Sequence, residues 1–152
     1  ATNADQLATV IGHEVAHVIA QHSAERMSLQ SVAGTGTQLL AVLMGDSPQK
    51  ASVMAMLGLG AQYGLVLPYG RTQESEADVV GLEYMAKAGF DPSASIQLWQ
   101  NMSAASDGQP PEFMSTHPSH ESRIKELQRQ QKKAAPLYQQ ARASGLRPAC
   151  KG

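Results

Sequence analysis

Residues 12–22, with the sequence GHEVAHVIAQH, place ionisable side chains inside an apolar, alanine-rich run. Asn3, followed three residues later by Gln6, is typical of a helix capping box, and Asp5 falls in the first turn, where the helix dipole favours negative charge. These signals predict a helix over residues 4–29, buried through its apolar side chains. The side chains at helical spacing are Leu7, Val10, Ile11, Val15, Val18, Ile19 and His22.

Two histidines in this run have the spacing of metal ligands. His13 and His17 are four residues apart, so a helix places both imidazoles on one face, one turn apart. Neutral imidazole is a good ligand for Zn²⁺, and Glu14 can reach a water at the metal and act as its general base. The alternative is two ordinary helix histidines and a surface glutamate. His22 points elsewhere around the helix and is predicted to be a structural histidine near the site.

A catalytic zinc site has three protein ligands and one open position, so a third ligand is required. The segment RTQESEADVVG, residues 71–81, supplies Glu74 and Asp78 four residues apart on one predicted helix face. One of these carboxylates can bind the metal while the other accepts the N–H of a ligand histidine. Gly81 would let this helix approach the first one closely. The alternative is a solvated acidic helix start.

The rest of the chain is also predicted to be helical. Residues 51–67 carry no charge, and we expect a buried or site-covering helix there rather than a membrane-inserted one. A third helix is expected to begin near Pro68–Arg71 and to run to about Ala88, ended by Gly89. The next begins at Asp91 and Pro92, and the last near Ser119. We expect one mainly α domain over residues 1–152, with residues 133–152 as a helical tail.

Composition and charge exclude some functions. The formal net charge is −1, with no stripe of Lys and Arg among aromatic residues, so no nucleic-acid partner is expected. One cysteine, Cys150, cannot form a disulfide framework. The sequence begins at Ala1 without a signal-like segment, and we interpret it as a piece of a longer protein.

Three segments in order, HEVAH, ESEADVVGLEYMAKAGFDP and STHPSHESRI, resemble the catalytic core of the HtpX/CAAX-prenyl-protease family of zinc metallopeptidases. The resemblance covers about residues 5–127 and is closest to the soluble bacterial envelope branch. These enzymes are gluzincins, in which two histidines and a glutamate hold one zinc ion. The resemblance therefore implies a zincin-like core that binds one Zn²⁺.

The resemblance also implies a role for individual residues. His13, His17 and Glu74 would be the metal ligands, with Glu74 favoured over Glu76, and Glu14 would be the general base. The remaining assignments are Asp78 as the carboxylate behind a ligand histidine, His117 as the residue that stabilises the oxyanion or closes the site, and Arg123 as an anchor of the loop that carries His117.

The function implied is a zinc metalloendopeptidase that cleaves unfolded or misassembled envelope proteins in the bacterial periplasm or at the outer membrane. The alternative is a zinc-stabilised, chaperone-like binding module with gated or absent proteolysis. The family's β-sheet before the HExxH helix is missing from this chain, which would expose apolar surface over residues 7–19 and favour a homo-oligomer. Membrane-associated partners would act through the full-length protein.

Overall fold

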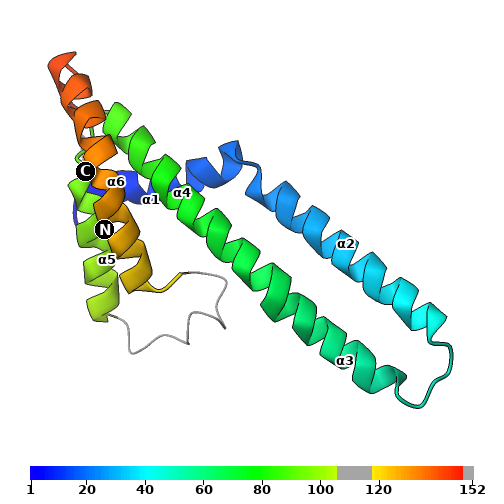
Figure 1. The fold of residues 1–152 in the computed structure, drawn as a ribbon. Coiled ribbons are helices and arrows are strands. Elements are labelled where there is room, and N and C mark those ends of the chain that lie inside the picture. Colours follow the sequence, from blue (N-terminus) through cyan, green and yellow to red (C-terminus); the bar gives the residue numbers. More distant parts are fainter. Residues whose placement is uncertain (106–117, 149–152) are drawn as a thin grey trace.

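The computed structural model describes residues 1–105 and 118–148. Within those two ranges every regular element is helical, as the sequence predicts (Figure 1). Part of the chain forms a projecting helical hairpin, and the other helices pack together into a body (Figure 1). The elements are α1 (Ala4–Ile19), α2 (His22–Leu43), α3 (Lys50–Ala61), the π-helix η1 (Gln62–Val66), α4 (Leu67–Lys87), α5 (Ser93–Ala105) and α6 (His120–Ala143).

The predicted helix starts are set by local side-chain hydrogen bonds. The Asn3 side chain accepts from the N–H of Gln6 at 2.8 Å, which caps α1 as predicted. The second bond of the capping box differs, because the Gln6 side chain accepts from the N–H of Thr2 at 2.8 Å. Ser119 caps α6 by accepting from the N–H of Ser122.

The turn between α4 and α5 also follows the prediction. Gly89 has a positive φ of 85°, the left-handed conformation that glycine adopts at helix ends. Asp91 then accepts from the N–H of Ser93 at 2.9 Å, as an N-cap does. The N–H of Asp91 itself donates to the Asp5 carboxylate at 2.9 Å, which ties the start of α5 to the start of α1.

The prediction of one helix over residues 4–29 is wrong. The helix ends at Ile19, and Gln21 has a φ of 57°, in the left-handed region that few side chains other than glycine occupy. α2 then starts at His22 in a new direction (Figure 1). No Gly or Pro lies at this break, and the apolar periodicity continues across it. The sequence pattern therefore did not predict the end of the helix.

α1 crosses α4 at a point where both helices carry glycine. The buried side of α1 includes three small residues one turn apart, Ala8, Gly12 and Ala16. A Cβ added at Gly81 would lie 2.7 Å from the backbone carbon of Gly12 and 2.7 Å from the backbone nitrogen of His13. The close approach predicted for Gly81 is therefore confirmed, and its partner is Gly12.

The large apolar residues of α1 lie on the other side, which corrects the prediction that they bury the helix. Val18 is 77% exposed and Ile11 54% exposed. Burial of α1 depends instead on its small residues, which let the backbone of α4 come near. The surface expected to be exposed over residues 7–19 is exposed.

The apolar core lies where α4, α5 and α6 meet beneath α1. Its buried members include Leu82 and Met85 from α4 and Leu127 from α6. Partly buried aromatic and aliphatic residues close its margin, namely Phe90, Ile96, Trp99, Leu137 and Tyr138. This core packs the middle of α4 against α1 and α6.

A helical hairpin, which we call the arm (residues 27–70), projects from this body (Figure 1). α2 forms one side, and α3 and η1 form the other and continue into α4 as one helix over Lys50–Lys87. The prediction of a buried or site-covering helix over residues 51–67 is wrong for α3, because none of its residues is buried and none lines the pocket at the site. An uncharged apolar run looks the same in the sequence whether its helix is buried or exposed, so the sequence does not distinguish the two.

Replacing Gly81 with alanine tests the helix crossing. The new methyl group meets backbone atoms that cannot swing away, so we expect the free energy of unfolding to fall by about 1–3 kcal/mol. The matched control is Gly34→Ala in α2, where an added Cβ meets nothing within 4 Å; that change should stabilise the helix by about 0.5–1 kcal/mol. Urea unfolding measures both, and equal midpoints for the two variants would contradict the close contact.

Candidate metal centre

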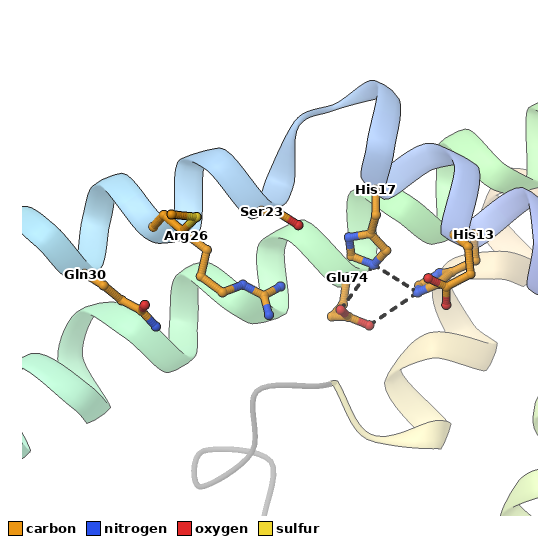
Figure 2. A pocket seen from close by; sticks show the side chains of 8 residues that line it. His13, His17, Ser23, Arg26, Gln30 and Glu74 are labelled. Carbon is orange, nitrogen blue, oxygen red and sulfur yellow. Dashed lines mark hydrogen bonds and ion pairs between the residues drawn. The ribbon is translucent and has the colours of Figure 1, made fainter.

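The crossing of α1 and α4 brings three potential metal ligands together. His13 Nε2 and His17 Nε2 are 3.1 Å apart. The Glu74 carboxylate lies 3.5 Å from His13 Nε2 and 3.3 Å from His17 Nε2 (Figure 2). Both imidazoles and the carboxylate thus direct one atom each toward a common point.

These separations fit one metal ion. Ligand atoms bound tetrahedrally at ~2.0–2.1 Å from a zinc ion lie about 3.3–3.4 Å from one another. The three donors, His13, His17 and Glu74, lie within 4.8 Å of one another in the structure, close to that requirement without any rearrangement of the helices. The donor set of two imidazoles and one carboxylate is also the set that zinc hydrolases use, with a fourth position left for water or substrate.

His13 is supported from behind by Asp78, one turn after Glu74 on α4. Asp78 Oδ1 lies 3.0 Å from His13 Nδ1, so the ring donates there and leaves Nε2 free for a metal. Arg123 from α6 holds the same carboxylate through two bonds, Nε to Oδ2 at 2.7 Å and Nη2 to Oδ1 at 2.5 Å. A buried carboxylate needs such a partner, and Asp78 is only 6% exposed.

The Arg123 guanidinium is held in turn by an aromatic ring. Its central carbon lies 3.6 Å from the centre of the Trp99 ring of α5, a cation–π arrangement that also fixes the plane of the guanidinium. Arg123 Nη1 is also 3.6 Å from Glu74. One cation therefore offsets the charge of both buried carboxylates of α4.

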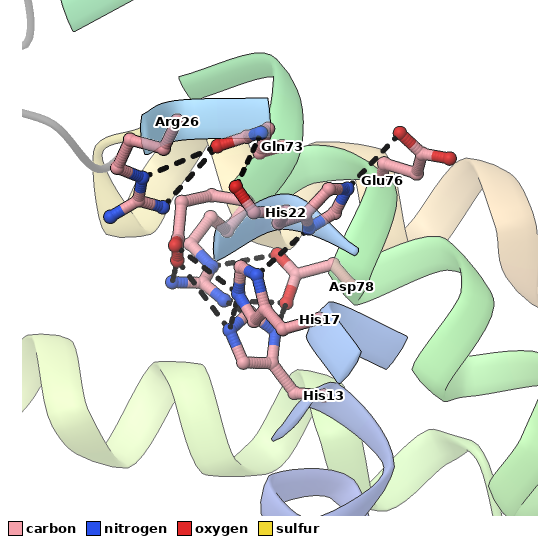
Figure 3. A network of polar contacts seen from close by, with 9 residues as sticks. His13, His17, His22, Arg26, Gln73, Glu76 and Asp78 are labelled. Carbon is pink, nitrogen blue, oxygen red and sulfur yellow. Dashed lines mark hydrogen bonds and ion pairs between the residues drawn. The ribbon is translucent and has the colours of Figure 1, made fainter. Parts of the chain in front are cut away.

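His17 has a different support. Its Nδ1 lies 2.8 Å from Nδ1 of His22, which is 2% exposed, and His22 Nε2 lies 3.4 Å from the Glu76 carboxylate (Figure 3). The main-chain oxygen of His22 accepts from the side chain of Gln73 at 3.2 Å. The prediction that His22 packs near the site is confirmed, and the ring contacts a candidate ligand directly.

The donors open onto a pocket of about 490 Å³. Glu14 lines it beside His13 and His17, and its side chain is exposed to solvent. One face of α2 forms the rest of the wall, where Figure 2 shows Arg26 and Gln30 on the same side as Glu74. A water, or the backbone of an extended peptide, can therefore reach the three donors and Glu14 together.

Comparison with known proteins agrees with this geometry. The sequence profile of peptidase family M48 matches residues 1–131. The chain belongs to peptidase family M48. It is 38% identical over 126 residues to the mitochondrial metalloendopeptidase OMA1 of Schizosaccharomyces pombe, covering 82% of this chain and 36% of that protein. The metalloendopeptidase OMA1 of Bos taurus is 39% identical over 138 residues, covering 84% of this chain and 26% of that protein.

A bacterial protein is also similar. The β-barrel assembly-enhancing protease of Escherichia coli is 32% identical over 150 residues, which cover 91% of this chain and 30% of that protein. The M48 chain thus spans about a quarter to just over a third of the length of these relatives. No solved structure matches it.

The two histidines of the HEVAH segment, His13 and His17, have pKa values shifted in opposite directions. Burial lowers the pKa of His13, but hydrogen bonds to Asp78 and Glu74 and the charge of Asp78 outweigh it and raise the pKa from 6.5 to about 9. Burial lowers the pKa of His17, helped by the charges of His13 and His22. The metal-free site therefore holds a protonated His13 and a neutral His17 at pH 7.

The structure brings together most of the predicted site residues. His13, Glu14, His17, Glu74, Asp78 and Arg123 lie around one point, whereas His117 lies outside the described residues. Glu76, the rejected alternative to Glu74, faces His22 and is 55% exposed. Sequence reasoning missed Trp99 and Gln73, because neither has a spacing that links it to the histidines. Gly12, directly before His13, could have predicted the close contact between α1 and α4.

Zinc binding to the M48 chain should release a proton from His13. Zinc requires neutral imidazole, so apparent affinity should rise about tenfold per pH unit from pH 7 and level off above about pH 9. Titration calorimetry in buffers of different ionisation enthalpy counts the proton released. In the absence of metal, the ion pairs of protonated His13 stabilise the fold fully below about pH 6.5, and this contribution is lost as pH rises through 9. Binding without proton release at pH 7 would contradict the raised pKa.

Proposed function

We propose that this chain is the catalytic part of a zinc-dependent metalloendopeptidase. One observation carries the proposal, namely that His13, His17 and Glu74 converge on one point with Glu14 beside them in an open pocket. Membership of peptidase family M48 and similarity to proteins named metalloendopeptidases support it. The three donors would hold one Zn²⁺, with Asp78 and Arg123 keeping His13 and Glu74 in place.

The chemistry divides between the metal and the chain. A zinc ion at this point supplies a Lewis acid that lowers the pKa of a water and polarises a peptide carbonyl. The Glu14 carboxylate accepts the proton of the attacking water and later donates it to the leaving amine. The exposure of Glu14 on the pocket lets it meet both water and substrate. His117 is proposed to stabilise the oxyanion, as the sequence motif suggests.

Unfolded or misassembled proteins of the bacterial envelope are the proposed substrates, cleaved in the periplasm or at the outer membrane. The name of the E. coli relative, a β-barrel assembly-enhancing protease, supports this setting. The OMA1 relatives are mitochondrial by name. An open pocket with polar and apolar lining suits extended, poorly sequence-specific polypeptide.

Replacing Glu14 with glutamine separates metal binding from catalysis. A glutamine amide cannot accept the proton, so cleavage of unfolded casein by Glu14→Gln should fall at least about 100-fold, while zinc content stays at one ion per chain. The control is Glu83→Gln, which changes an exposed carboxylate of α4 that pairs with Lys87 at 3.5 Å and should leave cleavage unchanged. Wild-type turnover by Glu14→Gln would contradict the proposal. Zinc binding without cleavage by the native chain, together with suppressed aggregation of casein, would favour the chaperone-like alternative.

A further inference from the structure

The pocket at the metal centre has two walls of different chemistry. One wall contains the three metal donors and Glu14, and the other is a face of α2 that carries Ser23, Arg26, Met27 and Gln30. The last three follow Ser23 by three, four and seven residues, which is the spacing of side chains on one helix face. Among the described residues that line the pocket, Arg26 is the one arginine or lysine.

The wall formed by α2 is long enough to contact a short stretch of peptide. A helix rises ~1.5 Å per residue, so the wall from Ser23 to Gln30 is about 10 Å long. An extended peptide advances ~3.3 Å per residue, so this length corresponds to about three residues of substrate. Figure 2 shows Arg26 between Ser23 and Gln30 along this wall. A peptide whose scissile bond lies at the donors therefore has a residue close to that bond beside Arg26.

The Arg26 side chain is held by a buried amide of α4. Gln73 is 2% exposed, and its Oε1 accepts from Nε of Arg26 at 3.4 Å and from Nη2 at 3.3 Å (Figure 3). The orientation of this amide is fixed, because its Nε2 donates to the main-chain oxygen of His22 at 3.2 Å and to the Glu25 carboxylate at 3.1 Å. Gln73 therefore positions the guanidinium at the pocket.

Most of the hydrogen-bonding capacity of this guanidinium is left for a ligand. An arginine side chain has five N–H groups, and Gln73 accepts from two of them. The other three include the edge formed by Nη1 and Nη2, which matches the two oxygens of a carboxylate. Within residues 1–105 and 118–148, Arg26 forms no ion pair.

Nearby carboxylates of the chain have other partners. Glu74 lies 3.6 Å from Nη1 of Arg123. Glu25, which precedes Arg26 in the sequence, accepts from the hydroxyl of Tyr69 at 3.0 Å. A half-buried guanidinium binds an anion more strongly than a fully hydrated one, because the lower local dielectric strengthens a charge-assisted hydrogen bond. Arg26 is therefore suited to an acidic group that enters the pocket from outside.

We propose that Arg26 is a specificity-determining residue that binds a carboxylate of the substrate close to the scissile bond. The proposal rests on the peptidase function proposed above and adds what its pocket selects. The carboxylate belongs either to an aspartate or glutamate side chain or to the C-terminus of the polypeptide being cleaved. Ser23, Met27 and Gln30 carry no charge, so the selection acts at one position and the rest of this wall accepts varied side chains.

Matched peptides with amidated C-termini test this selection. They share one cleavable sequence and carry Glu, Gln or Lys at one of the two positions on either side of the scissile bond. At one of these positions the zinc-loaded native chain should cleave the Glu peptide with a kcat/KM about 10–100-fold above that of the Gln peptide, the usual effect of hydrogen bonds to a charged group. The difference should lie mainly in KM, because Arg26 contacts a part of the substrate that does not react.

Substitutions of Arg26 separate selection from structure. In Arg26→Gln the ratio of kcat/KM for the Glu peptide over the Gln peptide should fall about 10–100-fold, and Arg26→Lys should retain part of the preference. Arg26→Glu should favour the Lys peptide. The matched control, Arg147→Glu, makes the same change of charge at an exposed position that does not line the pocket, and should keep the native ratio. If Arg26 only joined α2 to α4, cleavage of all peptides would fall together and the ratio would not change.

A further pair of peptides distinguishes the two sources of the carboxylate. Both have a neutral residue at the selected position and end there, one with a free C-terminal carboxylate and the other with an amide. Dependence on Arg26 for the internal Glu peptide assigns the site to acidic side chains. Dependence on Arg26 for the free acid alone assigns it to the end of a polypeptide.

Binding to an inactive chain gives a second measurement that does not require turnover. Fluorescence anisotropy measures the affinity of the labelled Glu and Gln peptides for the Glu14→Gln chain, with and without zinc. Adding Arg26→Gln should weaken binding of the Glu peptide about 10–100-fold and binding of the Gln peptide far less. A native chain with no preference for either carboxylate, or an equal loss for both peptides, overturns the proposal. Binding that depends on Arg26, without cleavage by the native chain, would refute the peptidase function and leave the carboxylate site.

Discussion

The backbone contact between Gly12 and Gly81 sets the distance between α1 and α4, and the site depends on that distance. His13 follows Gly12 directly, and Glu74 lies two turns before Gly81 on the facing helix. With side chains at the crossing, the two helices would stand farther apart and the carboxylate could not come within 3.5 Å of both imidazoles. The close approach of Gly12 and Gly81 thus determines how His13, His17 and Glu74 are arranged.

Close packing of these helices creates an electrostatic problem, which α5 and α6 solve. Glu74 and Asp78 are 5% and 6% exposed, and two buried carboxylates without a cation would repel each other and lose their hydration. Arg123 lies against both, and Trp99 covers its guanidinium. α6 therefore supplies the positive charge, and α5 the aromatic ring over it, that offset the two carboxylates buried on α4.

The sequence predicted those features that depend on local chemistry. Asn3 and Ser119 cap helices through bonds to residues three positions away, and the four-residue spacing of Glu74 and Asp78 put both on one face. Features that depend on distant partners were missed. The left-handed Gln21 has no local signature, and the choice of Ala8, Gly12 and Ala16 as the packed side of α1 follows from Gly81, which is far away in the sequence. An uncharged run, such as residues 51–67, gives the same pattern in a core and on a surface.

The position of Arg123 in the chain has a consequence for synthesis. The ribosome makes His13, His17, Glu74 and Asp78 first, whereas the cation that neutralises the carboxylates follows Asp78 by 45 residues and lies on the last helix. Until α6 emerges and docks, Glu74 and Asp78 lack the guanidinium that offsets part of their charge, which makes the buried crossing with α1 less stable. The metal centre of a growing chain is thus completed only after Arg123 has been made.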